Sequence, residues 1–312
     1  MKKLFHFFIF SIIFMEYLTS ATLSDHFQQY ILNNFDPNYL KYFTREDLGK
    51  KASVGGKNNN NDIISRRPVI IIHGISNKLQ RFQGMINKLK EKGYKSWEVY
   101  GTTWGDGGKT PATLVTAKCE YIKVIRQFII AVSKYTNNMV DIIAYSMGSP
   151  LTRKAIIGGK CVDTGEYLGM PLENVIHTYI SVAGANYGSS LCIYPIPISA
   201  CNKLNGLYCG SSFLEDINSQ RRYEGKKIYS IFSIHDEKVG SYGCGKYLSP
   251  IIGGDGYIKK SGMSHDKVMD ETREIQITLL NRRLNFILKP FDDNIKKNNY
   301  KPYYSHGCMW IT

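Results

Sequence analysis

The sequence predicts an α/β protein with a mostly parallel central sheet and helices on both of its faces. Continuous runs of apolar, β-branched residues, such as residues 68–72, are typical of strands buried on both faces of a parallel sheet. These runs alternate with segments of helical periodicity, and such alternation favours parallel strands joined by crossover helices. The 312-residue chain contains 43% hydrophobic residues, which is ample for one large core or two small ones.

The alternation begins after a leader at residues 22–65, which holds a short helix near residues 26–32 and an asparagine-rich loop. We expect strands at residues 68–72, 97–100, 140–144, 175–182 and 228–234. We expect helices at residues 79–92, 114–135, 149–157 and 266–284. These elements predict one domain at residues 66–285.

Both ends of the chain have a distinct composition. Lys2 and Lys3 precede an apolar run at residues 4–14, and small residues occupy positions 19–21. This pattern indicates a secretory signal peptide at residues 1–21, so we expect a secreted protein. The alternative is a membrane anchor, for which the apolar run is short. Residues 286–312 form a basic tail, which we expect to pack on the domain or extend it.

The chain is basic, with 40 Lys and Arg against 26 Asp and Glu and a net charge of +14. The charges are scattered and form no nucleic-acid module, so we expect no nucleic-acid partner. A basic secreted protein can make transient contact with an anionic lipid surface. The oligomeric state is not indicated by the sequence.

The cysteines favour disulfide bonds, since secretion leads to an oxidising environment. Three of the seven, Cys192, Cys201 and Cys209, lie in a stretch rich in Gly, Ser and Pro, and the odd total leaves at least one thiol unpaired within the chain. That stretch, residues 186–212, is either a disulfide-stapled wall of a substrate cleft or a plain surface loop. No C-x-x-C or H-x-x-x-H spacing is present, so no metal site is expected.

The run at residues 140–148 has the pattern of a nucleophile elbow, in which a serine sits on a sharp turn between a strand and a helix. The tight turn requires small residues two positions before and after Ser146, and the chain has Ala144 and Gly148 there. The motif is therefore A-x-S-x-G. The alternative is an ordinary strand-to-helix turn with a capping serine.

A parallel sheet forms its sites outside the carboxyl ends of its strands, so residues that follow strands are the candidates for chemistry. Ser146 follows one predicted strand, Asp236 follows another, and His265 precedes the last predicted helix. The order Ser, Asp, His is that of the α/β-hydrolases, with Ser146 as nucleophile, His265 as base and Asp236 orienting the imidazole. Glu237 and Asp255 are alternative acids, and His306 in the tail is a weaker alternative base.

An oxyanion hole needs two backbone N–H groups that are fixed in space. One is expected from Met147, which follows the nucleophile. The other is expected from Ile75, because His73 and Gly74 make the turn after the first core strand. We therefore assign His73 to this turn rather than to catalysis. The alternative is a turn that merely ends the strand.

Several motifs together resemble the class 2 lipases, and most closely the nematode secreted lipase-related proteins. The resemblance is carried by residues 72–74, 141–150, 182–188 and 235–240, and extends from about residue 66 to residue 284. It implies an α/β-hydrolase fold and a secreted triacylglycerol lipase or carboxylesterase without a metal or organic cofactor. It also implies the triad Ser146, Asp236 and His265 and the oxyanion donors Ile75 and Met147.

The resulting expectation is ester hydrolysis through an acyl-enzyme on Ser146, with a lipid or other ester as substrate. The same triad also serves an acyltransferase, a phospholipase or a thioesterase, since a fold does not select its substrate. A secreted binding protein that lost catalysis is the alternative from another class, although a binder has no need of all three triad residues.

Overall fold

The computed structural model describes residues 22–194 and 197–281 of the chain. The expected signal peptide at residues 1–21 and the basic tail at residues 286–312, with His306 and Cys308, lie outside the described residues. Within the described residues, no helix is both long and apolar enough to span a bilayer.

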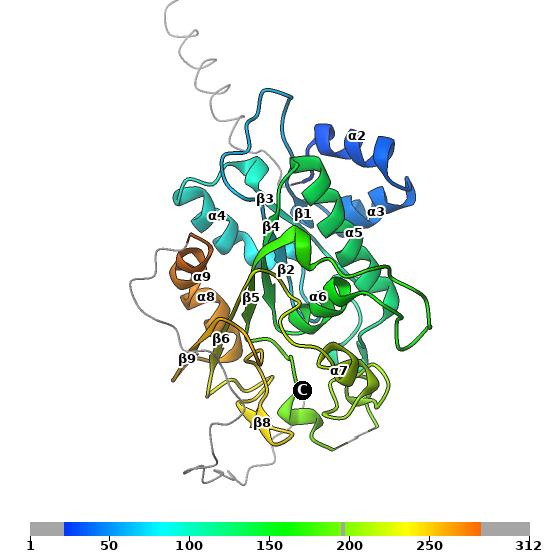
Figure 1. Cartoon of the computed structure of the whole chain (residues 1–312), viewed down its shortest axis with the longest axis vertical. Coiled ribbons are helices and arrows are strands. Elements are labelled where there is room, and N and C mark those ends of the chain that lie inside the picture. Colours follow the sequence, from blue (N-terminus) through cyan, green and yellow to red (C-terminus); the bar gives the residue numbers. More distant parts are fainter. Residues whose placement is uncertain (1–21, 195–196, 282–312) are drawn as a thin grey trace, which may run out of the picture.

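The centre of the molecule is a seven-stranded sheet with the order β1-β3-β2-β4-β5-β6-β9 (Figure 1). Every neighbouring pair is parallel except β1 and β3, which are antiparallel. The strands are β1 (Ser53–Val54), β2 (Val69–Ile72), β3 (Val99–Thr102), β4 (Val140–Tyr145), β5 (Ile176–Val182), β6 (Lys227–Ser233) and β9 (Gly256–Lys260). A small antiparallel pair, β7 (Tyr242–Gly243) and β8 (Lys246–Tyr247), lies outside this sheet. The mostly parallel sheet predicted from the apolar runs is confirmed.

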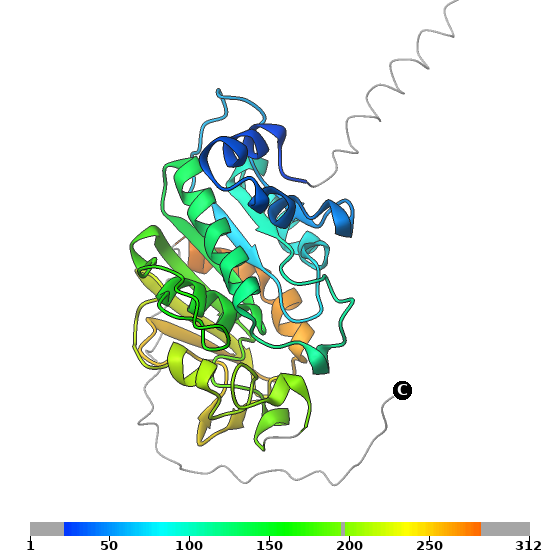
Figure 2. The ribbon, with the colours of Figure 1, turned by 90° about the vertical axis from the view of Figure 1, so that its right-hand side faces the viewer.

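Helices cover both faces of the sheet, as expected (Figures 1 and 2). One face packs against α2 (Asp25–Asn34), α3 (Asn38–Thr44), α5 (Cys119–Thr136), α6 (Gly148–Ile157) and α7 (Ser212–Ile217). The other face packs against α4 (Gln83–Glu91), α8 (His265–Glu271) and α9 (Arg273–Leu280). Each face has its own apolar core because successive side chains of a strand point to opposite sides of the sheet.

The leader is part of this architecture. It supplies β1 and the helices α2 and α3, and Phe27, Ile31 and Phe43 are fully buried in the same core as α5. Phe27 contacts the rings of Tyr100 and Phe128 at centroid distances of 5.6 and 6.4 Å. Residues 22–55 therefore fold with the sheet rather than beside it.

Several element boundaries differ from the prediction. The residues expected to begin a strand at position 97 form a 3₁₀ turn, Ser96–Glu98, before β3 begins at Val99. The helix expected from position 114 starts only at Cys119, after a 3₁₀ turn at Ala112–Leu114. The helix expected at residues 266–284 begins at His265 and is divided into α8 and α9 at Thr272. Its last expected residues, 282–284, lie outside the described part of the chain.

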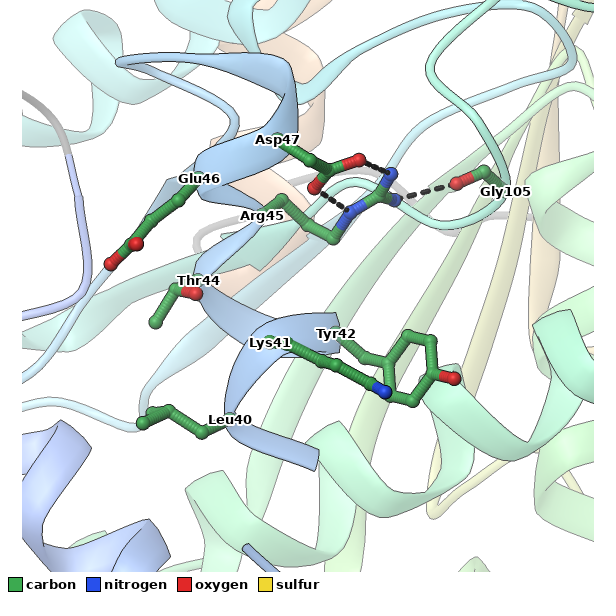
Figure 3. A pocket seen from close by; sticks show the side chains of 8 residues that line it. All are labelled: Leu40, Lys41, Tyr42, Thr44, Arg45, Glu46, Asp47 and Gly105. Atoms are coloured by element: carbon green, nitrogen blue, oxygen red, sulfur yellow. Dashed lines mark hydrogen bonds and ion pairs between the residues drawn. The ribbon is translucent and has the colours of Figure 1, made fainter. Parts of the chain in front are cut away.

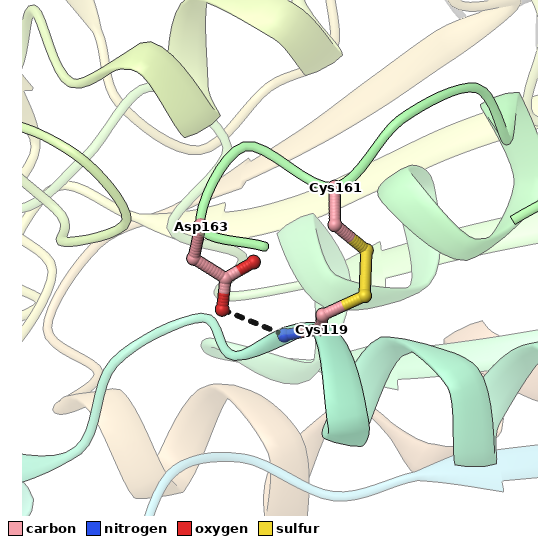
Figure 4. A group of neighbouring side chains, drawn as sticks. All are labelled: Cys119, Cys161 and Asp163. Atoms are coloured by element: carbon pink, nitrogen blue, oxygen red, sulfur yellow. Dashed lines mark hydrogen bonds between the residues drawn. A yellow bond between two sulfur atoms is a disulfide. The ribbon is translucent and has the colours of Figure 1, made fainter. Parts of the chain in front are cut away.

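Three disulfides confirm the expectation from the cysteine content: Cys119–Cys161, Cys192–Cys201 and Cys209–Cys244. The first joins the start of α5 to the loop after α6 (Figure 4). Asp163 lies beside it and accepts the backbone N–H of Cys119 at 3.0 Å, so it satisfies a donor at the helix start. The close approach of these three side chains is explained by a disulfide and a helix cap.

Candidate active site

Ser146 lies on a sharp turn between β4 and α6, as the elbow motif predicts. Its backbone has φ 55°, in the left-handed region that non-glycine residues seldom adopt. Met147 returns to φ −61° and α6 begins at Gly148. The backbone N–H of Ser146 donates to the carbonyl of Val182 on the neighbouring strand at 3.0 Å, which holds the turn against the sheet.

The small residues of the motif are required by close packing. A Cβ atom on Gly148 would lie 2.2 Å from the carbonyl oxygen of His73, and one on Gly74 would lie 2.8 Å from the Cβ of Ser146. The turn at residues 73–75, which we call the oxyanion loop after its expected donor Ile75, can therefore approach the elbow only with glycine at both positions. Ala144 is fully buried in register with Ile72 and Ser181, so its methyl group fits where many elbows have glycine.

The structure brings Ser146, His265 and Asp236 into one hydrogen-bonded chain, although they are far apart in sequence. The Nε2 of His265 is 2.9 Å from the Oγ of Ser146, and its Nδ1 is 2.7 Å from the Oδ2 of Asp236. A carboxylate only accepts, so Nδ1 carries the proton and Nε2 accepts from the serine hydroxyl. All three residues are buried, with 6%, 3% and 5% of Ser146, His265 and Asp236 exposed.

The carboxylate of Asp236 is itself held in place. Its Oδ1 accepts the backbone N–H groups of Lys238 and Val239 at 3.0 and 2.9 Å, which leaves Oδ2 for His265. Glu237, an alternative acid from the sequence, accepts the backbone N–H of His265 instead and so supports the position of the base. These contacts place Asp236, and not its neighbour, against the imidazole.

Asp255, the other alternative acid, lies elsewhere. Asp255 accepts the backbone N–H of Ile228 at 2.8 Å and pairs with Arg222. His235 is exposed, and its Nδ1 accepts the backbone N–H of Gly262 at 2.9 Å.

A further pair of polar groups flanks His265, and the sequence prediction missed it. The hydroxyl of Tyr145 donates to Asp266 at 2.7 Å, and Lys238 pairs with the same carboxylate at 2.9 Å. Burial raises the pKa of Asp266, but the hydrogen bonds from Lys238 and Tyr145 outweigh burial and the net pKa is lowered. The Tyr145 ring lies 4.9 Å from the imidazole of His265. The sequence did offer one signal for this pair, since Tyr145 directly precedes Ser146 and Asp266 directly follows His265.

The two expected oxyanion donors line the same cavity as Ser146 and His265. Among the hydrogen bonds of residues 22–194 and 197–281, none uses the backbone N–H of Ile75 or Met147 as donor. Met147 also precedes the first turn of α6, where the helix dipole favours negative charge. The arrangement can therefore stabilise an oxyanion that develops beside Ser146.

His73 orders the oxyanion loop. Its Nδ1–H donates to the carbonyl of Gly74 at 2.7 Å, and its Nε2 accepts the backbone N–H of Trp104 at 2.9 Å. The indole N–H of Trp104 donates to the His73 carbonyl at 2.8 Å, and the two rings stack with centroids 4.8 Å apart. Burial lowers the pKa of His73 to about 4, so the imidazole is neutral near pH 7 and can accept from Trp104.

The leader supports this loop through Arg45. The Nη1 of Arg45 donates to the carbonyls of Thr103 and Gly105 at 2.5 and 2.6 Å, on either side of Trp104. Figure 3 shows the bond to Gly105. The Nε and Nη2 of the same guanidinium donate to the two carboxylate oxygens of Asp47, each at 2.8 Å. No sequence pattern indicated a role for Arg45. It lies in the leader, which has no clear periodicity, and it contacts the backbone carbonyls that flank Trp104.

Two pockets of different character lie near these groups. The one beside Arg45 has a volume of about 500 Å³, but the Arg45 donors that reach it are directed at Asp47 and at backbone carbonyls (Figure 3). The cavity at Ser146 is smaller, about 230 Å³, and its lining is mainly apolar. The smaller cavity is the candidate substrate site, because it alone of these two is lined by Ser146, His265 and the expected oxyanion donors Ile75 and Met147.

Comparison with known proteins gives a consistent result. Residues 66–278 match the family model described as lipase (class 2). No curated protein matches the chain. Lipase B of Aspergillus fumigatus superposes with a TM-score of 0.54 at 13% identity, over 85% of this chain and 76% of that one. The propeptide form of lipase BlEst2 from Bacillus licheniformis gives a TM-score of 0.49 at 12% identity, over 74% and 53% of the two chains. The first superposition and the topology of the sheet show an α/β-hydrolase fold.

Proposed function

We propose, from the premise that this chain belongs to the class 2 lipase family and is a carboxylic ester hydrolase, that it cleaves lipid esters through an acyl-enzyme on Ser146. The observation that carries the proposal is the hydrogen-bonded chain from Ser146 through His265 to Asp236. A serine hydroxyl is a weak nucleophile, and an adjacent base that is oriented by a carboxylate is the arrangement that activates it.

In the first half of the reaction, the Oγ of Ser146 bonds to the ester carbonyl carbon while its proton moves to Nε2 of His265. The tetrahedral oxyanion is stabilised by the backbone N–H groups of Ile75 and Met147. The bond to the alcohol oxygen then breaks, and the leaving oxygen takes the proton from Nε2. The products of this half are the free alcohol and an acyl group on Ser146.

In the second half, water attacks the acyl carbon and gives its proton to Nε2 of His265. Collapse of the second oxyanion breaks the bond to Ser146, whose Oγ takes the proton back. Asp236 remains ionised and stabilises the imidazolium in both halves. The net reaction consumes one water and releases one carboxylic acid and one alcohol.

We also propose that the protein is secreted and that its nearest relatives are the nematode secreted lipase-related proteins. Three disulfides among the described residues support an oxidising destination. The expected signal peptide at residues 1–21 is tested by sequencing the amino terminus of protein collected from the medium of an expressing culture. A mature chain that still begins at Met1 would contradict it.

The catalytic assignment is tested with a fluorophosphonate probe and an ester substrate. We expect the probe to label Ser146 in the folded protein, and Ser146→Ala to abolish both label and hydrolysis. Ser219→Ala is the matched control, because Ser219 is exposed at the end of α7 and should leave both unchanged. A folded protein that takes no label would instead favour a binding protein on this fold.

The acceptor distinguishes hydrolysis from acyl transfer. With a soluble ester and no added alcohol, we expect the free acid as product in the same amount as the released alcohol. An acyltransferase would turn over only when a second alcohol is supplied. Parallel assays with a phospholipid and a thioester test the phospholipase and thioesterase alternatives.

A further inference from the structure

One side of the cavity at Ser146 is formed by a single stretch of chain between β5 and α7. Among its described residues, this stretch supplies eight lining residues, Ala185, Ser189, Leu191, Cys192, Ile198, Ala200, Cys201 and Leu207, and we call the last six the wall residues. They are apolar or disulfide-bonded, and Cys192 and Cys201 are linked to each other. The stretch thus brings two 3₁₀ turns, Ser190–Cys192 and Ser199–Cys201, together at the cavity.

The wall is anchored to the loop that carries Asp236. The backbone N–H of Ser190 donates to the carbonyl of Val239 at 2.8 Å, and the hydroxyl of Ser189 donates to the carbonyl of Lys238 at 2.7 Å. Lys238 and Val239 are the two residues whose backbone N–H groups hold Asp236. The wall therefore has a fixed position relative to the catalytic groups at this end.

The other end of the wall is held by backbone contacts. Leu207 donates its N–H to the carbonyl of Ala200 at 2.6 Å, and Asn205 accepts the N–H of Ala117 at 2.8 Å. The Cys192–Cys201 disulfide and the bond between Leu207 and Ala200 link parts of the stretch to one another. The bond between Asn205 and Ala117 links the stretch to the segment before α5. Its position is set by covalent and backbone contacts rather than by side-chain ion pairs.

The direction of proton transfer indicates which end of an ester faces the wall. The leaving alcohol takes its proton from Nε2 of His265, so it must lie on the His265 side of the cavity. The lining on that side includes the charged pair Lys238 and Asp266, and the anchored end of the wall meets this side through Ser189 and Ser190. The other end of the wall, with Ile198, Ala200 and Leu207, contributes only apolar side chains to the lining. The apolar acyl chain is better accommodated by the apolar wall.

We propose that the wall residues form the acyl-chain site and set its length, so that the substrates are esters of short- to medium-chain carboxylic acids. The inference rests on the proposed ester hydrolysis at Ser146. The cavity has a volume of about 230 Å³. A methylene occupies nearly the volume of a water molecule, about 30 Å³, so the whole cavity, including the part for the alcohol, holds at most roughly eight carbons.

Two wall residues give variants with opposite expectations. Ala200→Phe adds a ring to the wall and shortens the site, whereas Ile198→Ala removes volume from the wall and lengthens it. We expect Ala200→Phe to lower kcat/KM for the octanoate ester by at least tenfold while the acetate ester changes by less than about threefold. We expect Ile198→Ala to move the optimum by about two carbons toward longer chains. Leu204→Ala is the matched control, because Leu204 lies in the same stretch, is 46% exposed and does not line the cavity.

The measurement is kcat/KM for 4-nitrophenyl esters from acetate to dodecanoate, kept below their critical micelle concentration, with fluorophosphonate labelling of every variant. A second series holds the acyl group as acetate and lengthens the alcohol. Opposite shifts for the two variants in the acyl series alone support the proposal. A labelled Ala200→Phe and Ile198→Ala pair whose acyl profiles match the parent chain would overturn it. Shifts confined to the alcohol series would overturn the assignment of the acyl chain to the wall.

Failure of the proposed function would give a different result, because the parent chain itself would then take no fluorophosphonate label.

Discussion

The two sides of the cavity at Ser146 are built on different physical principles. One side, which we call the oxyanion side, carries Ile75 and Met147, the expected oxyanion donors. Behind Ile75, the turn at His73 and Gly74 is fixed to the loop around Trp104 by hydrogen bonds, a ring stack and a buried guanidinium. A second side consists of the wall residues, which are fixed by a disulfide and by backbone contacts. Under the two proposals above, donors on the oxyanion side must be aimed, whereas the wall must only exclude water and fit an apolar chain.

The difference between the two sides predicts which of them controls the rate and which controls the choice of substrate. A hydrogen-bond network specifies direction, and electrostatic stabilisation of an oxyanion depends on direction. An apolar surface closed by a disulfide specifies volume, and chain-length selection depends on volume. We therefore expect damage to the oxyanion side to lower kcat and damage to the wall to change substrate preference.

The largest effect is expected from Trp104→Ala. The substitution removes the stack on His73 and the bond to its carbonyl, and truncation of a buried tryptophan costs about 3–5 kcal/mol of unfolding free energy. We also expect kcat on a soluble ester to fall by roughly a hundredfold, as when an oxyanion donor is misplaced. Denaturant unfolding and steady-state kinetics measure the two effects. Trp97→Ala is the control, because the Trp97 indole binds Ile63 far from the site, and an equal loss of kcat there would refute the comparison.

The two disulfide pairs separate stability from selectivity. Cys119 and Cys161 are 42 residues apart, and the loop-entropy model gives a loss of about 4 kcal/mol when both become serine. Cys192 and Cys201 are only 9 residues apart, so the corresponding loss is about 3 kcal/mol. We expect only the second, less destabilising change to flatten the acyl-chain profile. The measurement is the acyl-chain profile of both double serine variants, under conditions where each is folded. Equal profiles for the two variants would contradict a role of the wall in chain-length selection.

Arg45→Ala tests whether the leader contributes to catalysis. The substitution leaves the carbonyls of Thr103 and Gly105 without their donor, which costs about 1–3 kcal/mol for buried groups. Because these carbonyls flank Trp104, we expect kcat to fall by about tenfold with little change in KM. Arg45→Lys should recover only part of kcat, since an ammonium does not reproduce the planar fork. Arg222→Ala is the control, since Arg222 is half-exposed and pairs only loosely with Asp255. A change in KM alone would speak against a role in positioning the oxyanion loop.

The smallest effect is expected from mild acid on the parent chain, because two buried groups act in opposite directions. The folded pKa of His73 lies at about 4, below its unfolded value near 6.5, so its contribution to stability is present above pH 6.5 and is lost as the pH falls toward 4. Burial raises the pKa of Asp141 to about 6, above its unfolded value near 3.8, despite the opposing effects of Arg67 and Thr178. Its contribution is present below pH 3.8 and is lost as the pH rises through 6.

Asp141→Asn should therefore reveal the His73 contribution as a loss of up to about 3 kcal/mol in unfolding free energy between pH 6.5 and pH 4. In the parent chain we expect the net change over this interval to be under about 1 kcal/mol from these two groups. Denaturant unfolding at a series of pH values gives both curves. Parallel curves for the parent and Asp141→Asn would show that Asp141 does not titrate in this range.

Much of the fold was predictable because its signal is local. The apolar runs at β2 and β4 and the pattern around Ser146 identify a parallel sheet and its elbow without tertiary information. The order of Ser146, Asp236 and His265 also led to three residues that the structure places in contact, although their roles remain predictions. Both the elbow pattern and the order of these three residues were read from positions that follow strand ends, where a parallel sheet collects its site.

What was missed depends on contacts between distant segments. Arg45 acts through the carbonyls around Trp104, and no periodicity or motif encodes such a contact. The short edge strand β9 is only partly buried and lacks the apolar run that marked the central strands. The pairing of Cys209 with Cys244 joins two loops whose proximity only the folded sheet determines.

The backbone of Ser146 also has an evolutionary consequence. A left-handed φ of 55° costs a serine roughly 1 kcal/mol relative to the glycine that adopts this conformation freely. Selection for stability alone would thus favour glycine over the proposed nucleophile, and Ser146→Gly should yield an inactive protein that unfolds at a higher denaturant concentration. A lineage that no longer needed to turn over esters would drift readily toward that replacement. The serine in this chain is therefore a residue that stability by itself does not maintain.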